Sequence, residues 1–181
     1  MSVEECIRRE SGLRDPSQVD RLCLDQAKCH EGLALLAPFE NLVSLSIQDA
    51  GISSLETLPP LKNLNTLKLS DNKIRGGLES LEGSPELEKL YLAGNHIPSF
   101  DELKPLEKLS KLAWLDLEGN PVTKLSDYSR SVFELLPNLL VLDGKDREGQ
   151  ELEENEDDDE EEDDDDEEGE EGEEGEEGEE G

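Results

Sequence analysis

The feature of this sequence that most constrains its fold is a recurring leucine pattern, L-x-x-L-x-L-x-x-N-x-L. Three copies match the pattern in full, two earlier copies carry alanine in place of the asparagine, and a partial sixth copy follows. Successive copies begin 22 to 27 residues apart, at Val19, Leu42, Leu64, Leu87, Leu112 and Leu139. A period in this range is the signature of stacked structural repeats, each of which buries its apolar face against its neighbours.

Within each copy the x-L-x-L segment alternates, which predicts a short strand with its leucines facing inward and the intervening residues facing out. We therefore predict an α/β fold: a right-handed leucine-rich-repeat solenoid whose parallel strands line a concave face. On the return side, leucines fall three residues apart at positions 55, 58, 61 and 64, and again at 103, 106, 109 and 112. This spacing, together with prolines at 59, 60 and 105, predicts short 3₁₀ or irregular turns in place of long helices.

The asparagine at the ninth position of the pattern has a structural explanation. It follows the strand at a bend where backbone groups are buried and lack partners, and its side-chain amide both donates and accepts hydrogen bonds. We therefore interpret Asn72, Asn95 and Asn120 as structural residues and assign them no ligand.

Both ends of a solenoid must be capped, because each would otherwise expose the core. At the N-terminus, Ser2 and Glu5 have the spacing of a capping box and Gly12 suits a helix stop, so an amphipathic cap helix is predicted. At the other end, Asp127 is expected to cap a second helix that ends at Pro137. The inward-facing residues of that helix are predicted to be Tyr128, Val132, Phe133 and Leu136. The repeat domain with its caps is assigned to residues 1–150, with closure near Gly144.

Residues 151–181 form a second, very different segment. They include 24 acidic residues and no basic ones, and so contribute −24 of the net charge of −32. Their apolar content is too low to offset the entropy of ordering, which predicts a disordered polyacidic tail. Fully extended, the tail reaches on the order of 105 Å, about one charge per 4.4 Å. In water two charges repel by about RT at roughly 7 Å, and the charges of the tail are closer together than that. Counterions should therefore crowd onto the tail as they do on nucleic acid, and a cationic partner gains free energy by releasing them. The alternative is that the tail only maintains solubility.

Charge and composition exclude several classes of function. The acidic balance opposes direct binding to nucleic acid or anionic membranes and favours basic proteins as partners. No apolar leader, bilayer-length apolar stretch or glycosylation sequon is present. Together with the three cysteines, Cys6, Cys23 and Cys29, this predicts an intracellular chain with reduced thiols.

Catalysis finds little support in the sequence. His30 and His96 fall at turn positions without a nucleophile or acid partner, and Cys23, Cys29 and His30 fit no zinc spacing. We predict a non-enzymatic protein with no cofactor and no metal site, apart from weak, diffuse binding of divalent cations by the tail.

The concave face is where side chains are free to meet a partner. Among the outward positions Arg21, Cys23, Ser44, Ser46 and Thr66, followed by Lys68, Lys89, Tyr91, Trp114 and Asp116, the last five are our candidate contacts. Trp114 is the single tryptophan and lies on the outward phase, as expected of a binding hot spot; alternatively it covers the edge of the core or stacks on Lys89. The candidate contacts in the tail are Asp157, Asp158, Asp159, Glu160, Glu161, Glu162, Asp163, Asp164, Asp165, Asp166, Glu167 and Glu168.

These features together resemble the leucine-rich acidic nuclear phosphoprotein family. The likeness rests on the short amphipathic start, the spacing of five repeats, the closing segment from Leu125-Ser126-Asp127-Tyr128 through Leu142-Asp143-Gly144-Lys145-Asp146, and the acidic run directly after it. The spliceosomal A-prime subunit and leucine-rich phosphatase regulators share such repeats but lack the tail. The resemblance implies histone binding and chaperoning, inhibition of histone acetylation and of a serine/threonine phosphatase, and shuttling between nucleus and cytoplasm.

The sequence departs from the family in two respects. It ends at Glu179-Glu180-Gly181 without the basic signal that family members usually carry, so we expect either a longer natural chain or another route into the nucleus. The tail contains no Ser or Thr, which restricts phosphorylation to the folded domain, where Ser99 and Ser131 fit acid-directed kinases. We therefore predict a histone-binding regulator, with a phosphatase inhibitor or adaptor acting through the concave face as the alternative.

Overall fold

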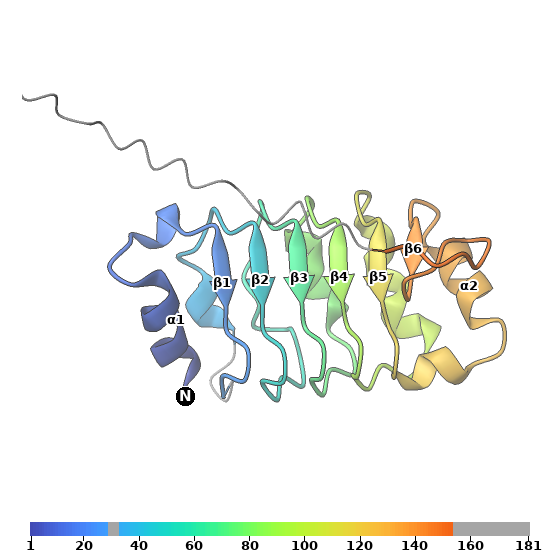
Figure 1. Ribbon diagram of the computed structural model, residues 1–181, viewed down its shortest axis with the longest axis horizontal. Helices are drawn as coiled ribbons and strands as arrows, with labels where there is room; N and C mark the ends of the chain where they lie inside the picture. Colours follow the sequence, from blue (N-terminus) through green and yellow to red (C-terminus); the bar gives the residue numbers. More distant parts are fainter. Residues whose placement is uncertain (29–32, 154–181) are drawn as a thin grey trace, which may run out of the picture.

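A computed structural model describes residues 1–28 and 33–153 and confirms the predicted solenoid. Six strands form one parallel sheet in sequence order, side by side in a single row (Figure 1). They are β1 (Arg21–Cys23), β2 (Ser44–Ser46), β3 (Thr66–Lys68), β4 (Lys89–Tyr91), β5 (Trp114–Asp116) and β6 (Val141–Leu142). Residues 29–32 and 154–181 lie outside the described residues, and with them Cys29, His30 and the tail contacts predicted from Asp157 to Glu168.

The register of the sheet brings the pattern leucines into one buried row. Leu45, Leu67 and Leu90 are aligned across β2 to β4, and Leu22, Leu115 and Leu142 extend the row to both edges. All six are at most 3% exposed, whereas the residues on either side of each leucine in β2 to β5 are half-buried. This alternation confirms the predicted strand phase and directs the intervening side chains to the concave face.

The return side consists of 3₁₀ helices and irregular turns, as the three-residue leucine spacing predicts. The 3₁₀ segments are η1 (Pro16–Gln18), η2 (Ala34–Leu36), η3 (Leu78–Gly83), η4 (Phe100–Lys108) and η5 (Pro121–Lys124). At nine residues, η4 is longer than expected and contains Pro105. Proline's fixed φ is compatible with a helical turn, so here the ring shapes the segment without interrupting it.

The three asparagines join each repeat to the one before it. Asn72 Oδ1 accepts hydrogen bonds from the amides of Ala50 (3.1 Å) and Ile52 (3.0 Å), and its Nδ2 donates to the carbonyl of Ile47 at 2.7 Å. Asn95 and Asn120 make the equivalent bonds one and two repeats further along. All three are buried, which confirms their structural role.

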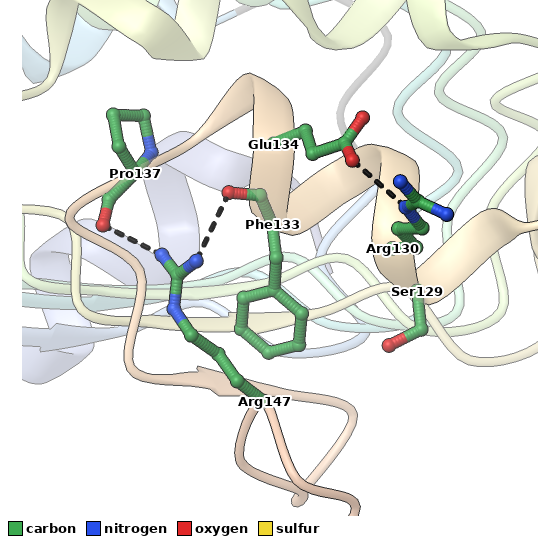
Figure 2. A pocket seen from close by; sticks show the side chains of 6 residues that line it. All are labelled: Ser129, Arg130, Phe133, Glu134, Pro137 and Arg147. Atoms are coloured by element: carbon green, nitrogen blue, oxygen red, sulfur yellow. Dashed lines mark hydrogen bonds and ion pairs between the residues drawn. The ribbon is translucent and has the colours of Figure 1, made fainter.

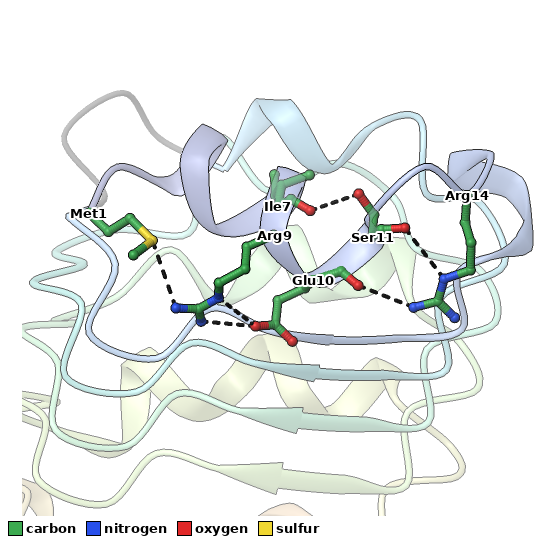
Figure 3. A network of polar contacts seen from close by, with 6 residues as sticks. All are labelled: Met1, Ile7, Arg9, Glu10, Ser11 and Arg14. Carbon is green, nitrogen blue, oxygen red and sulfur yellow. Dashed lines mark hydrogen bonds and ion pairs between the residues drawn. The ribbon is translucent and has the colours of Figure 1, made fainter.

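The N-terminal cap is helix α1 (Val3–Ser11), which has the predicted capping box. The Glu5 amide donates to Ser2 Oγ, and the Ser2 amide donates to the Glu5 carboxylate. Gly12, at φ 60°, ends the helix. Beyond it Arg14 folds back and donates to the carbonyls of Glu10 and Ser11, which satisfies the last turn (Figure 3).

The C-terminal cap is helix α2 (Tyr128–Leu135), packed at the opposite end of the sheet (Figure 1). Val132, Phe133 and Leu136 are buried as predicted. The expected capping role of Asp127 is wrong: this residue is left-handed (φ 56°), and its side chain accepts no bond from the first turn of α2, a turn that lies wholly within the described part of the chain. Tyr128 is partly buried and donates its hydroxyl to Asp143 Oδ2 at 2.9 Å.

The described backbone continues past the predicted closure at Gly144. Lys145 bridges to Glu151, and the amide of Leu152 donates to the carbonyl of Gly144 at 2.8 Å. The first two residues of the acidic segment therefore return to the loop after β6. Within residues 1–28 and 33–153, no helix has the length and apolarity needed to cross a membrane.

Candidate partner-binding surface

The sheet brings the five predicted concave residues together on three adjacent strands. Lys68 lies on β3, Lys89 and Tyr91 on β4, and Trp114 and Asp116 on β5; all five side chains are half-buried. In the register, Lys89 is opposite Trp114, and Tyr91 has Lys68 on one side and Asp116 on the other. We call this group the concave strip.

One cation–π contact lies within the concave strip. Lys68 Nζ lies 5.7 Å from the centroid of the Tyr91 ring, which is within the range of this interaction. The contact joins β3 to β4, and the stacking of Trp114 on Lys89 considered from the sequence stays a prediction. An aromatic ring on this face therefore accepts a positive charge from its own chain.

Next to the concave strip, three carboxylates gather at the ends of β5 and β6. Asp116 and Glu118 follow one another on the outward phase, with the Glu118 amide donating to Asp116 Oδ1 at 3.0 Å. Asp143, directly after β6, accepts from the Leu117 amide at 2.7 Å. We call Asp116, Glu118 and Asp143 the acidic corner. Sequence reasoning found Asp116 alone; extending the strand alternation by two residues would have added Glu118.

The carboxylates of the acidic corner lie close enough for their charges to shift the pKa of Asp143. Burial raises the pKa of the Asp143 carboxyl, and the negative charges of Asp116 and Glu118 raise this pKa further. Bonds from the Leu117 amide and the Tyr128 hydroxyl oppose the rise. Burial, followed by the charge of Asp143, also raises the pKa of Tyr128. The corner is thus a region of negative potential with a neutral phenol at its base.

The N-terminal half of the concave face has a different character. Small polar side chains leave a shallow hollow of about 370 Å³ between β1 and β3, bordered by Arg21, Cys23 and Lys68 among others. The Asp25 carboxylate at its edge accepts from Ser46 Oγ and from the Gln48 amide, each at 2.7 Å. This carboxylate is therefore already engaged by the chain's own donors.

A second hollow, of about 700 Å³, lies in the C-terminal cap (Figure 2). Arg147 covers the Phe133 ring, with its guanidinium carbon 4.9 Å from the ring centroid, and donates to the carbonyl of Pro137 at 2.6 Å. It also donates to the carbonyls of Phe133, Leu136 and Leu139. Because its donors satisfy carbonyls at the end of α2, Arg147 fastens the 143–152 loop to the helix.

Across residues 1–28 and 33–153, no group of three or more His, Cys, Asp or Glu side chains is arranged to hold a metal ion. His96 is exposed in the turn after β4, as expected of a solvated loop residue.

Comparison with known proteins identifies relatives with leucine-rich repeats. The family model for the leucine-rich repeat matches residues 24–165. The acidic leucine-rich nuclear phosphoprotein 32 family member A of Drosophila pseudoobscura pseudoobscura is 38% identical over 151 residues, which cover 83% of this chain and 57% of that protein. Its Drosophila melanogaster counterpart is also 38% identical, with 58% of its length covered. These relatives confirm the resemblance based on the repeats and acidic run, and this chain spans less than two thirds of their length.

Solved structures support the same fold. The Drosophila melanogaster SNF/U2A' complex contains a chain that superposes with a TM-score of 0.65 at 27% identity, covering 79% of this chain and 83% of that one. An internalin from Listeria monocytogenes superposes with a TM-score of 0.57 at 19% identity, covering 76% and 47% of the two chains, and shows the fold alone.

Proposed function

This chain belongs to the leucine-rich repeat family, with acidic leucine-rich nuclear phosphoproteins among its relatives, and we propose that it is a non-enzymatic, histone-binding regulator of the chaperone type. In this proposal the solenoid recognises shape and the acidic segment attracts Lys- and Arg-rich chains. Masking histone lysines in this way would limit their acetylation.

The observation that carries the proposal is the direct junction of a capped solenoid and a polyanion. The described backbone is hydrogen-bonded up to Leu152, and from Glu153 onward the sequence is almost entirely carboxylate and glycine. Such a charge density attracts polycations over a distance and raises association rates. The protein would thus compete with DNA for histones without binding DNA itself.

Two further observations support a role in protein–protein interaction within the nucleus. The curated relatives are named nuclear phosphoproteins, and the SNF/U2A' neighbour was solved as a complex. We therefore propose residence in the nucleus, where histones are concentrated, with shuttling to the cytoplasm as part of the same hypothesis.

The proposal is tested by measuring binding to core histones at graded salt. The full chain would be compared with residues 1–153, a truncation that keeps every described hydrogen bond of the C-terminal cap. If a histone engages six or more tail carboxylates, affinity for the full chain should fall about 10³-fold between 50 and 200 mM salt, as for nucleic-acid contacts. Equal and salt-insensitive binding by both forms would contradict the proposal.

A second function is favoured by the half-buried Trp114 opposite Lys89: inhibition of a serine/threonine phosphatase, or an adaptor role, through the concave strip. The double variant Trp114→Ala, Lys89→Ala separates the two functions. It should abolish phosphatase binding and only weaken histone capture, because the polyanion is left intact.

A further inference from the structure

Aromatic side chains and carboxylates meet in the C-terminal half of the concave face, and we propose that this region seats an arginine-containing, extended segment of the basic partner. The inference rests on the proposed function and adds the surface and the side-chain class that it recognises. Its elements are Tyr91 and Trp114 from the concave strip and the three residues of the acidic corner.

Trp114 supplies the ring. It faces outward from β5, is half-buried, and has Val141 of β6 opposite it on the side away from Lys89. Tryptophan is the strongest cation–π acceptor among the side chains. The contact between Lys68 and Tyr91, one strand away, shows that a cation can lie over an aromatic ring on this face.

The acidic corner supplies the charge. The Asp116 carboxylate accepts a hydrogen bond at Oδ1 from the Glu118 amide, and Glu118 is exposed. These carboxylates do not form a group that could hold a metal ion, as far as the described part of the chain extends. Carboxylates spread over the ends of two strands suit several cations on an elongated chain better than one compact ion.

The neighbouring lysines set the position of the segment. Lys68 and Lys89 lie on β3 and β4, so a partner's cations are repelled there and attracted toward β5 and β6. Strands are spaced about 4.8 Å apart and screening acts over about 8 Å at physiological salt. Charges of opposite sign therefore lie within one or two strand spacings of each other, close enough to act unscreened, which favours one register of the bound segment.

The acidic corner also lies where the polyanion begins. Asp143 is followed by Gly144, whose carbonyl accepts from the amide of Leu152, and the acidic run starts beside this contact. A basic chain captured by the polyanion is consequently led to the corner. Arginine is favoured over lysine because its planar guanidinium stacks on Trp114 while donating two bonds to a carboxylate such as Asp116.

The test uses the full chain, in which Trp114 is the single tryptophan and reports its own contacts by fluorescence. Two peptides of equal length and charge serve as probes, one of alternating arginine and glycine, the other of alternating lysine and glycine. The arginine peptide should change Trp114 fluorescence and bind several-fold more tightly by calorimetry. Asp116→Asn, which keeps the acceptor for the Glu118 amide, should weaken arginine-peptide binding about tenfold and leave the lysine peptide less affected.

Two matched variants on the same face complete the design. Thr66→Ala on β3 should leave binding unchanged, whereas Lys89→Ala should strengthen it, because a repelling charge is removed. If the arginine peptide binds by calorimetry without altering Trp114 fluorescence, and equally well to Asp116→Asn, the acidic corner is not the site, although the proposed function would stand. If the full chain does not bind core histones at any salt concentration, the proposed function itself is contradicted.

Discussion

Replacing Asn95 with alanine should reveal how much of the stability of this solenoid depends on its buried asparagines. Asn95 is 2% exposed. Its Oδ1 accepts from the Ile74 amide at 3.0 Å, and its Nδ2 donates to the carbonyls of Leu69 at 3.0 Å and Leu92 at 2.9 Å. The alanine variant leaves one amide and two carbonyls without these partners, in a region too well packed to admit water freely.

The magnitude follows from the cost of an unsatisfied buried polar group, which is about 1 to 3 kcal/mol. The Ile74 amide loses its partner, whereas the Leu69 carbonyl still accepts from Asn72 Nδ2 at 2.9 Å and the Leu92 carbonyl from Asn120 Nδ2 at 2.8 Å. One unsatisfied amide and two carbonyls with one bond fewer should lower the free energy of unfolding by about 2 to 3 kcal/mol. A domain of this size is stable by only about 5 to 15 kcal/mol. The side-chain amide of Asn95 thus accounts for a large share of the free energy of unfolding, because it joins two repeats.

The assay is urea denaturation followed by far-ultraviolet circular dichroism and by Trp114 fluorescence. Asn63→Ala is the matched control, since this asparagine is exposed and donates to the Glu40 carbonyl at the surface; its effect should be within about 0.5 kcal/mol. A loss below about 1 kcal/mol for Asn95→Ala, or one equal to the control, would refute the assignment of the asparagines as ties between repeats.

Three further predictions test other parts of the fold. Gly94→Ala should lower the free energy of unfolding by about 1 to 3 kcal/mol, measured by thermal melting, because φ is +66° and the added Cβ would clash with Asp71 Oδ1. Gly149→Ala, with φ +83° and no atom within 4 Å of the added Cβ, should cost less. Tyr128→Phe removes the bond to Asp143 and should cost about 1 to 2 kcal/mol in urea denaturation. Burial raises the pKa of Asp143 in the folded state, so the folded chain binds this proton more tightly than the unfolded chain. The stabilisation from the protonated Asp143 carboxyl is therefore present below about pH 4 and is lost as the pH rises through the raised pKa. The difference in unfolding free energy between the wild type and Asp143→Asn should change across that window and be constant above it.

The repeats were predictable because their information is local. Alternation of period two determines which face each leucine occupies, so Leu45, Leu67 and Leu90 could be assigned to one buried row before any register was known. The role of the asparagines could be predicted for the same reason, since a buried bend with unpaired amides follows every strand. The capping box at Ser2 and Glu5 is likewise contained within one helical turn.

The C-terminal cap was harder to predict because its contacts are not local. Asp127 has a residue type that favours caps, but its left-handed backbone turns the side chain away from that role. Tyr128 instead pairs with Asp143, 15 positions away in the sequence, and Arg147 reaches back to carbonyls at the end of α2. No periodic pattern marks such pairings.

The candidate surface could be predicted only in part. Strand phase gave the five concave residues, including the position of Trp114, because outward positions follow directly from inward ones. The acidic corner requires the return of the chain after β6, which brings Asp143 beside the end of β5. The partial sixth copy, which begins at Leu139, gives Asp143 the same repeat position as Asp116, so its place beside β5 could have been predicted from spacing. Its bond to the Tyr128 hydroxyl could not, because that contact depends on how α2 packs.

The position of the acidic corner has a consequence for how two weak contacts can act together. Two binding sites joined in one chain present the second site to a captured partner at a millimolar effective concentration. A corner contact with an intrinsic dissociation constant near 0.1 mM, about −5.5 kcal/mol, would therefore be occupied roughly nine-tenths of the time once the polyanion has captured a histone, and its loss would weaken binding about tenfold. Such a contact is weak alone, yet it can orient the bound chain. For this reason the effect of Asp116→Asn should be measured in the full chain at moderate salt, where capture and orientation are both present.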